Sequence, residues 1–144
     1  MLRTLFYFAI GLLLGGSCTY ALGQETGRLW LTTVPASYHT DREKDYNERH
    51  FPSLGLEWHA NRDTALLCGY YFNSRREQSV YAGAAYTPWQ TAHWRFGAAA
   101  IGVTGYDKRI APALAPTAMY EYGRFGFNVL TVGKVTAVQL KLAF

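Results

Sequence analysis

Alternate residues along 79–86 divide into two largely apolar faces when they are read with the two-residue period of a β-strand. One face of this strand would carry Val80, Ala82, Ala84 and Tyr86, and the other would carry Tyr81, Gly83 and Ala85. An aromatic-rich segment, 69–72, precedes it across the charged residues 73–78, which predicts a hairpin. Because one face has little bulk and residues 96–103 repeat this character, the hairpin fits a small β-barrel around an apolar hollow. From this stretch alone, an ordinary β-sandwich with closely packed sheets fits equally well.

The same alternation predicts eight strands over the rest of the chain. Their expected ranges are 27–39, 53–60, 64–72, 79–87, 93–104, 111–120, 125–132 and 137–144. The connections after the first, third and fifth strands are long and charged, whereas those after the second, fourth and sixth are short. Long loops at one end and short turns at the other are typical of outer-membrane barrels. We therefore predict an all-β fold, an eight-stranded antiparallel outer-membrane β-barrel with an apolar interior.

The distribution of aromatic residues agrees with a barrel that spans a membrane. The sequence contains 11 Tyr, 8 Phe and 4 Trp. Two interfacial girdles are predicted, one from Trp58, Trp89 and Trp94 near the short turns, and one from Tyr38, Tyr71, Tyr81 and Tyr106 near the long loops. The last strand places Val138, Leu140, Leu142 and Phe144 on one face, which we expect to contact lipid together with Val80, Ala82 and Ala84. These features disfavour a soluble periplasmic carrier.

The first residues predict a secretory signal peptide over 1–23, followed by the barrel domain at 24–144. Arg3 precedes an apolar run at 5–14, which is too short to span a membrane comfortably, and small residues follow it. Cys18 would leave with this segment, so that Cys68 would be a lone thiol. A sharper alternative makes Cys18 a lipidated N-terminus, since Ser17 precedes it.

Charge and motif content exclude several classes of partner. The formal net charge is +4 and the basic residues are scattered, so a nucleic-acid partner is not expected. No His, Cys and Asp spacing indicates zinc, and no glycine-rich phosphate loop is present. We predict a monomer without a metal or a cofactor.

Two residues near the expected rim offer the minimum chemistry for acyl transfer. His39 ends the first predicted strand, and Ser74 follows the third. A histidine that takes a proton from a hydroxyl can activate it as a nucleophile. Asp41, Asp45 or Glu48 could orient His39, although loop residues of these types are more often simply solvated.

Several segments resemble the PagP lipid A palmitoyltransferase family. Residues 35–39 and 45–49 resemble its first strand and loop, and residues 72–74 with 81–85 resemble its second rim motif. Later strands of the family are matched by 96–107 and 110–116, so the resemblance covers most of the chain after the signal segment. It implies an outer-membrane enzyme that moves a palmitoyl group from a membrane phospholipid to lipid A.

The resemblance also assigns roles to individual positions. His39 matches the family's histidine and Ser74 its serine, whereas Asn73 stands at the position of its aspartate. We therefore expect a base, an essential hydroxyl and an orienting group, in that order. The headgroup site would be shaped by Tyr46, Asn47, Glu48 and Arg49. Gly83 and Ala85 would line an acyl-sized pocket, with Ala85 at its floor. Lateral lipid gates would lie at Pro35 with Pro52 and at Pro112 with Pro116.

Three departures from the family pattern leave a second function open. Asn73 cannot carry the negative charge of an aspartate. Residues 24–28 are too short to supply the amphipathic helix that usually precedes the barrel, and the first external loop is shorter. The alternative is a non-enzymatic PagP-like barrel that binds a lipid or only stabilises the membrane.

Overall fold

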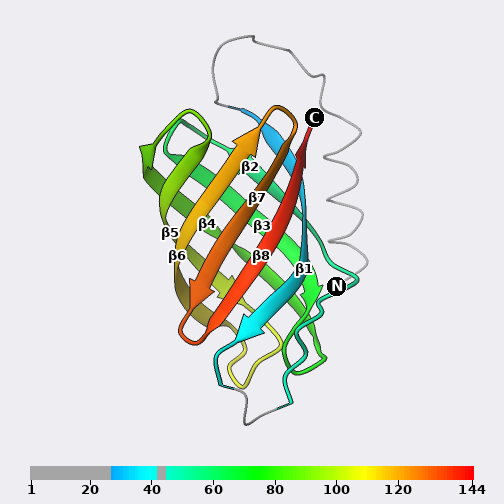
Figure 1. The fold of residues 1–144 in the computed structure, drawn as a ribbon. Helices are drawn as coiled ribbons and strands as arrows, with labels where there is room; N and C mark the ends of the chain where they lie inside the picture. Colours follow the sequence, from blue (N-terminus) through cyan, green and yellow to red (C-terminus); the bar gives the residue numbers. More distant parts are fainter. Residues whose placement is uncertain (1–26, 42–44) are drawn as a thin grey trace.

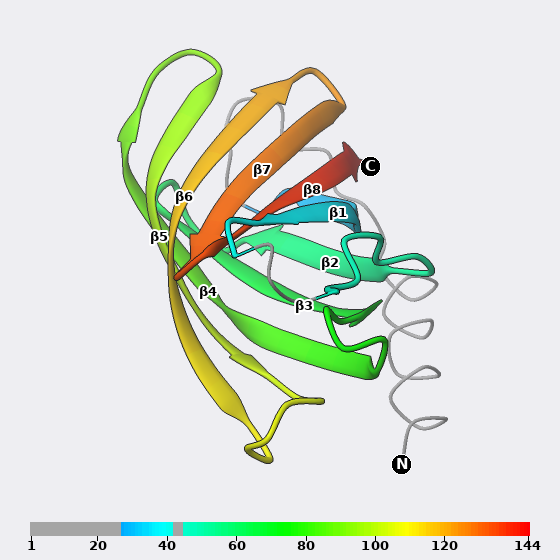
Figure 2. The ribbon, with the colours of Figure 1, turned by 60° about the horizontal axis from the view of Figure 1, so that its bottom comes forward.

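The computed structural model describes residues 27–41 and 45–144, so the expected signal peptide and Cys18 lie outside the described residues. Eight strands follow in chain order: β1 Leu29–His39, β2 Leu54–His59, β3 Thr64–Phe72, β4 Gln78–Gln90, β5 Trp94–Val103, β6 Ala111–Tyr122, β7 Phe125–Val132 and β8 Val135–Ala143. Each strand pairs antiparallel with its neighbours in sequence, and β8 pairs with β1 to close a barrel (Figure 1). Figure 2, which brings the long-loop end forward, shows the ring of strands around the interior. The predicted eight-stranded antiparallel barrel is confirmed, and the sandwich is excluded.

The strand boundaries differ from the predicted ones mainly in β4 and β8. β4 continues through Pro88 to Gln90, and its pairing with β5 shifts register between Tyr86 and Trp89. This irregularity accommodates a proline, which cannot donate a ladder hydrogen bond. β8 begins two residues earlier than predicted, at Val135, because Gly133 takes a positive φ of 56° in a tight turn after β7.

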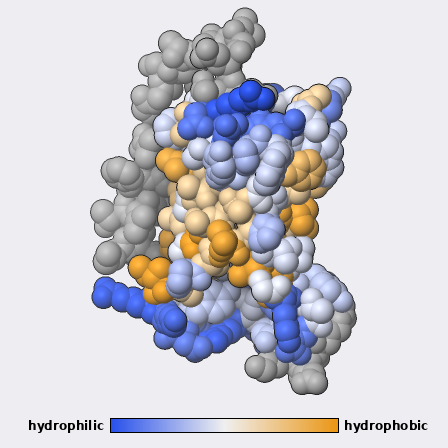
Figure 3. Space-filling model, turned by 90° about the vertical axis from the view of Figure 1, so that its left-hand side faces the viewer, coloured by the Kyte–Doolittle hydropathy of each residue, from blue (hydrophilic) through white to orange (hydrophobic). Residues whose placement is uncertain are grey.

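The face of the barrel drawn in Figure 3 carries an apolar band between two polar ends, and large apolar side chains are exposed on other strands as well. The exposed apolar side chains include Leu54, Leu66, Phe96, Leu114, Leu140 and Leu142. Trp58, Tyr86, Trp89 and Phe125 are exposed nearer the short turns, and Tyr38, Phe51 and Ile110 nearer the long loops. The predicted outward orientation of Leu140 and Leu142 is therefore confirmed. Within the described residues, no helix is long and apolar enough to cross a membrane.

The predicted loop-side girdle is wrong for three of its four tyrosines. Tyr38 is exposed, but Tyr81 is buried and Tyr71 and Tyr106 pack against the core. In β3 and β4, Tyr71 and Tyr81 share the inward face with buried neighbours such as Leu67 and Ala85. Their place in the two-residue alternation, and not their chemical type, therefore decides their side of the wall.

The interior has two chemically different ends. Near the short turns it holds a buried polar cluster, consisting of Glu57, His59, Arg95, Asn128, Gln139 and Lys141. A central apolar layer of Leu67, Tyr81, Ala85, Ala99, Val103 and Met119 follows. A cavity occupies the long-loop end. The predicted apolar interior thus holds for the central layer and the cavity, whereas polar groups that hydrogen-bond to one another fill the opposite end.

Candidate functional site

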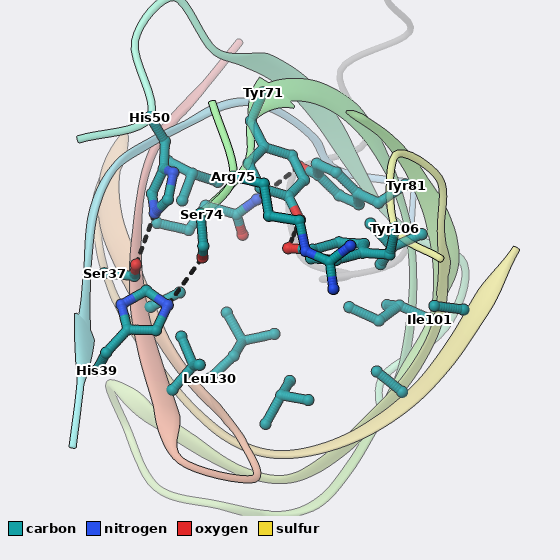
Figure 4. Close-up of a pocket in the computed structure, with 18 of the residues that line it drawn as sticks. Ser37, His39, His50, Tyr71, Ser74, Arg75, Tyr81, Ile101, Tyr106 and Leu130 are labelled. Atoms are coloured by element: carbon teal, nitrogen blue, oxygen red, sulfur yellow. Dashed lines mark hydrogen bonds between the residues drawn. The ribbon is translucent and has the colours of Figure 1, made fainter. Parts of the chain in front are cut away.

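The candidate site is a cavity of about 440 Å³ at the long-loop end of the barrel. Its apolar wall includes Leu67, Ile101, Val103, Leu130, Val132 and Val135. Tyr81 and Gln139 line the cavity and also belong to the central apolar layer and the polar cluster, respectively, and the Gln139 amide donates to the Tyr81 hydroxyl over 3.0 Å. Polar side chains gather at one side of the mouth (Figure 4). This volume lies in the range of roughly 300–1,000 Å³ that small-molecule sites occupy.

His39 and Ser74 meet at this mouth. His39 is the last residue of β1 and Ser74 follows the end of β3, and Nε2 of His39 lies 2.8 Å from Oγ of Ser74. The imidazole stacks on Tyr46, with 4.3 Å between ring centroids. The backbone N–H of His39 donates to a carboxylate oxygen of Glu48 over 3.3 Å. Among the described residues, no group bonds to Nδ1 of His39, so this nitrogen has no orienting partner there.

Asn73 does not orient His39, which corrects the role expected for it. Its fully buried amide nitrogen donates to Ser79 Oγ over 3.0 Å and to the Gly105 carbonyl over 2.7 Å. Its oxygen accepts the backbone N–H groups of Arg75 and Glu77. All of these partners belong to the loops at the mouth or to the start of β4. Asn73 therefore holds the loop that carries Ser74, and acts on the site only through that loop.

We expect Asn73→Asp to destabilise the barrel and to give no gain in acyl transfer. A carboxylate would place an oxygen against the Gly105 carbonyl and would lose both donated hydrogen bonds. Leaving such buried partners unsatisfied costs about 1–3 kcal/mol. Urea unfolding in detergent measures the loss. Asn61→Asp is the matched control, since the Asn61 side chain only accepts, from Asp63 and Thr64. Equal stability of the two variants, or higher activity of Asn73→Asp, would contradict this role.

The four residues expected at the headgroup site have different positions. Tyr46 lines the cavity, and Glu48 bonds to the His39 backbone. Asn47 binds the loop to the rim, because its backbone N–H donates to the Ser74 carbonyl over 2.9 Å and its side chain donates to the Asn73 carbonyl. Arg49 is exposed and forms a β-bridge with Ala36. Only Tyr46 and Glu48 are therefore placed to influence His39 directly.

Gly83 and Ala85 do not line the cavity, which corrects the expected pocket floor. Ala85 is buried in the central apolar layer below Tyr81. Gly83 pairs with Ile101 on β5, and a Cβ at Gly83 would collide with the Ala100 carbonyl and lie 2.7 Å from Cα of Ile101. The small residues of β4 therefore let neighbouring strands and side chains approach closely, and the hollow lies nearer the loops.

The wall has two interruptions, and each contains a pair of the predicted gate prolines. The β1–β2 ladder ends at Thr32 and Gly55. Beyond it the Ser53 side chain bonds to Val34, and the Pro35 carbonyl accepts the His50 N–H over 3.2 Å. The loop before β2, which includes Pro52, thus bridges this gap.

The second interruption lies between β6 and β7. The β6–β7 ladder begins at Thr117 with Leu130, so residues 111–116 of β6 pair with β5 alone. Pro112 and Pro116 lie in this unpaired stretch, and neither has an N–H to donate. Pro112 and Leu130, one on each side of the gap, both line the cavity. The cavity therefore reaches the barrel wall at this gap.

A second histidine and serine, Ser37 and His50, were missed by sequence reasoning. Oγ of Ser37 lies 2.6 Å from Nε2 of His50, and Nδ1 of His50 lies 2.5 Å from the Phe72 carbonyl oxygen. Burial lowers the pKa of His50 below its usual 6.5, the Phe72 carbonyl opposes this shift and His39 adds to it. Ser37 could have been found, because it precedes His39 by two residues and so shares its face of β1. His50 lies in a loop without any periodic pattern.

Charged residues occur at both ends of the interior. At the mouth, Arg75 forms a bidentate pair with Asp107 at 2.6 and 2.9 Å, and its guanidinium lies 5.6 Å from the centre of the Tyr106 ring. At the far end, Glu57, His59 and Glu121 present ligand atoms within 4.8 Å of one another. The ammonium of Lys141 contacts both carboxylates there, at 2.7 and 2.6 Å, so it occupies the position that a bound metal ion would need.

Comparison with known proteins supports the fold and goes no further. No family model matches the chain, and no curated protein matches it. Among solved structures, one described as "De novo design of transmembrane beta-barrels" matches with a TM-score of 0.61 at 17% sequence identity, covering 85% of this chain and 98% of that one. A likeness at this identity shows that the chain has the fold of a designed transmembrane β-barrel.

Proposed function

We propose that this protein is an outer-membrane acyltransferase that moves a palmitoyl-like chain from a phospholipid to lipid A. The observation that carries the proposal is the 2.8 Å contact between His39 Nε2 and Ser74 Oγ at the mouth of an apolar cavity. The apolar wall suits a hydrocarbon chain, and the mouth suits the ester that joins it to a polar headgroup. The resemblance of the rim segments to the PagP family points to the same reaction.

The chemistry needs only a base and a hydroxyl. Ser74 Oγ transfers its proton to Nε2 of His39 as it attacks the ester carbonyl of the phospholipid, and the proton then passes to the leaving alkoxide to give a lysophospholipid. A hydroxyl of lipid A attacks the acyl-serine next and gives its proton to His39, which passes it to the departing Ser74 Oγ and so regenerates the serine hydroxyl. No oxidant or metal enters the balance. Stacking on Tyr46 and the Glu48 contact to the backbone would hold His39 in place.

The membrane assignment rests on the outer surface. An apolar band between polar ends is what a barrel in a bilayer presents to lipid. The unpaired part of β6, beside Pro112 and Leu130, would give a lipid chain a lateral route to the cavity. Protein recovered from cells with the outer membrane, and shifted in a detergent gel by boiling, would support this assignment. Recovery as a soluble periplasmic protein would contradict it.

A non-enzymatic lipid-binding barrel is the second candidate. Two observations favour it. The Asn73 side-chain amide bonds to Gly105 in the rim loops, and among the described residues Nδ1 of His39 has no orienting partner. Purified protein in mixed micelles with labelled phospholipid and lipid A separates the two functions. Mass spectrometry should detect acylated lipid A and an equal amount of lysophospholipid. Phospholipid that binds without transfer, across several acyl donors, would favour the second function.

We expect Tyr81→Ala to lengthen the acyl chain that the protein prefers. Tyr81 closes the cavity above Ala85, so removal of its ring extends the hollow toward the central layer. One methylene more or less in an apolar pocket changes the preference between two acyl donors by roughly 10-fold or more. Competition between donors of graded chain length measures the shift. Tyr86→Ala, on the outward face of the same strand, is the matched control and should leave the preference unchanged. An unchanged preference in Tyr81→Ala would place the chain elsewhere.

A further inference from the structure

Two serine–histidine pairs line the cavity, His39 with Ser74 and His50 with Ser37. In the second pair both ring nitrogens of the histidine have hydrogen-bond partners, whereas in the first pair only Nε2 has one among the described residues. Ser37 lies on β1 two residues before His39, on the same inward face, and both Ser37 and His50 line the cavity. Figure 4 shows the Ser37–His50 pair beside the His39–Ser74 pair, on one side of the mouth. Both Ser37 and His50 are buried. The second pair is therefore enclosed by protein while it borders the same hollow.

The hydrogen bonds of His50 define which of its nitrogens is basic. A backbone carbonyl can only accept, so Nδ1 of His50 carries a proton and donates it to the Phe72 carbonyl at 2.5 Å. In a neutral imidazole the other nitrogen, Nε2, is then an acceptor. Ser37 Oγ, at 2.6 Å, must donate its proton to Nε2. Hydroxyl, imidazole and orienting acceptor thus stand in the order that activates serine nucleophiles on unrelated folds.

Three further contacts keep this arrangement in place. The backbone N–H of His50 donates to the Pro35 carbonyl over 3.2 Å, and the Phe72 N–H donates to the His50 carbonyl over 3.4 Å. The Tyr71 ring meets the imidazole edge-on, with 5.6 Å between centroids. His39 has no counterpart to the Phe72 carbonyl among the described residues. Burial also lowers the pKa of His50, which favours the neutral imidazole whose Nε2 can accept the Ser37 proton.

We propose that Ser37 and His50 form a second nucleophilic site. It hydrolyses carboxylic esters whose acyl part is held in the cavity, including esters of small alcohols. Ser37 Oγ bonds to the ester carbonyl carbon while its proton passes to Nε2 of His50, and the ester C–O bond breaks as His50 returns that proton to the leaving alcohol. Water then attacks the acyl-serine, with His50 again taking and returning a proton, and releases the carboxylic acid. The activity needs neither lipid A nor Ser74.

Covalent labelling tests this site without any lipid substrate. Full-length protein, folded in detergent, is treated with a fluorophosphonate probe, and the modified peptide is identified by mass spectrometry. We expect an adduct on Ser37 that persists in Ser74→Ala and His39→Ala and disappears in Ser37→Ala. In His50→Gln the adduct should form at least about 10²-fold more slowly. Hydrolysis of a p-nitrophenyl ester of a short acid should fall in parallel.

Three results would overturn the proposal. The first is the absence of an adduct on Ser37 in folded wild-type protein, a measurement that needs no variant. The second is labelling of Ser37 at an unchanged rate in His50→Gln that remains folded by detergent gel. The third is an equal rate in boiled protein, which would mean that the fold does not activate Ser37. Failure of lipid A acylation, with Ser37 labelled as expected, would instead count against the proposed transferase and leave this site standing.

Discussion

Replacing either His39 or Ser74 by alanine should lower acyl transfer to lipid A by about 10²–10⁴-fold, the usual cost of removing a positioned base or its nucleophile. His39 Nε2 and Ser74 Oγ are 2.8 Å apart, so each variant removes one end of the same contact. The double variant should be no worse than the single ones, because both substitutions disable one unit. Transfer of a labelled acyl chain from phospholipid to lipid A, followed by mass spectrometry, measures all three.

The barrel should survive these substitutions. Both side chains lie at the mouth, at the end of β1 and just after β3, outside the central apolar layer. Heat-modifiable migration in a detergent gel reports folding, and His93→Ala at the exposed turn before β5 is the matched control, with full activity expected. A folded Ser74→Ala variant that transfers acyl chains at the wild-type rate would refute the assigned role of Ser74.

Strand positions could be predicted well because they depend on local pattern. Alternation along β4 and β8 correctly placed Leu140 and Leu142 outside and Ala85 inside, whereas Tyr81, on the same face as Ala85, was wrongly assigned to the girdle. The barrel follows from eight such strands with alternating loop lengths, since closure removes exposed edges. Boundaries were less certain where a proline interrupts the ladder, as at Pro88 in β4.

The site could be predicted only in part, because it depends on contacts between distant loops. His39 and Ser74 were identified by their place at strand ends, and the structure brings them together. Asn73 was misassigned because its partners, Ser79 and Gly105, are set by how two loops pack, which no local pattern encodes. His50 reaches Ser37 and Phe72 only because its loop folds back over the gap between β1 and β2.

The polar cluster shows that an alternating pattern predicts which residues face inward but does not predict whether the interior is apolar. Glu57 and Lys141 occupy inward positions of β2 and β8, where one charged residue would be costly to bury alone. Their charged groups lie 2.7 Å apart inside the barrel, on the two strands that flank β1, although they are separated by 84 positions in the chain. A sequence read strand by strand cannot reveal such a pair, so the expected apolar interior holds for the central layer and the cavity but not for this end.

Lys141→Met should destabilise the barrel by about 3–5 kcal/mol, the usual cost of removing one partner from a buried ion pair. Lys141 donates to Glu57 at 2.7 Å and to Glu121 at 2.6 Å, so the variant leaves two carboxylates facing each other without an ammonium. Urea unfolding in detergent, followed by far-ultraviolet circular dichroism, measures the change. Lys134→Met in the exposed β7–β8 turn is the matched control and should have little effect.

The stronger test of this cluster is a double-mutant cycle. Glu57→Gln removes the charge that Lys141 neutralises and keeps one oxygen, which can replace either the Oε1 that bonds to His59 or the Oε2 that accepts from Asn128. Combined with Lys141→Met, it should recover part of the lost stability, so that the double variant is more stable than the two single effects predict when added. Strictly additive effects would mean that Glu57 and Lys141 stabilise the barrel independently, and the polar end of the lumen would then consist of separate contacts with no coupling through this ion pair.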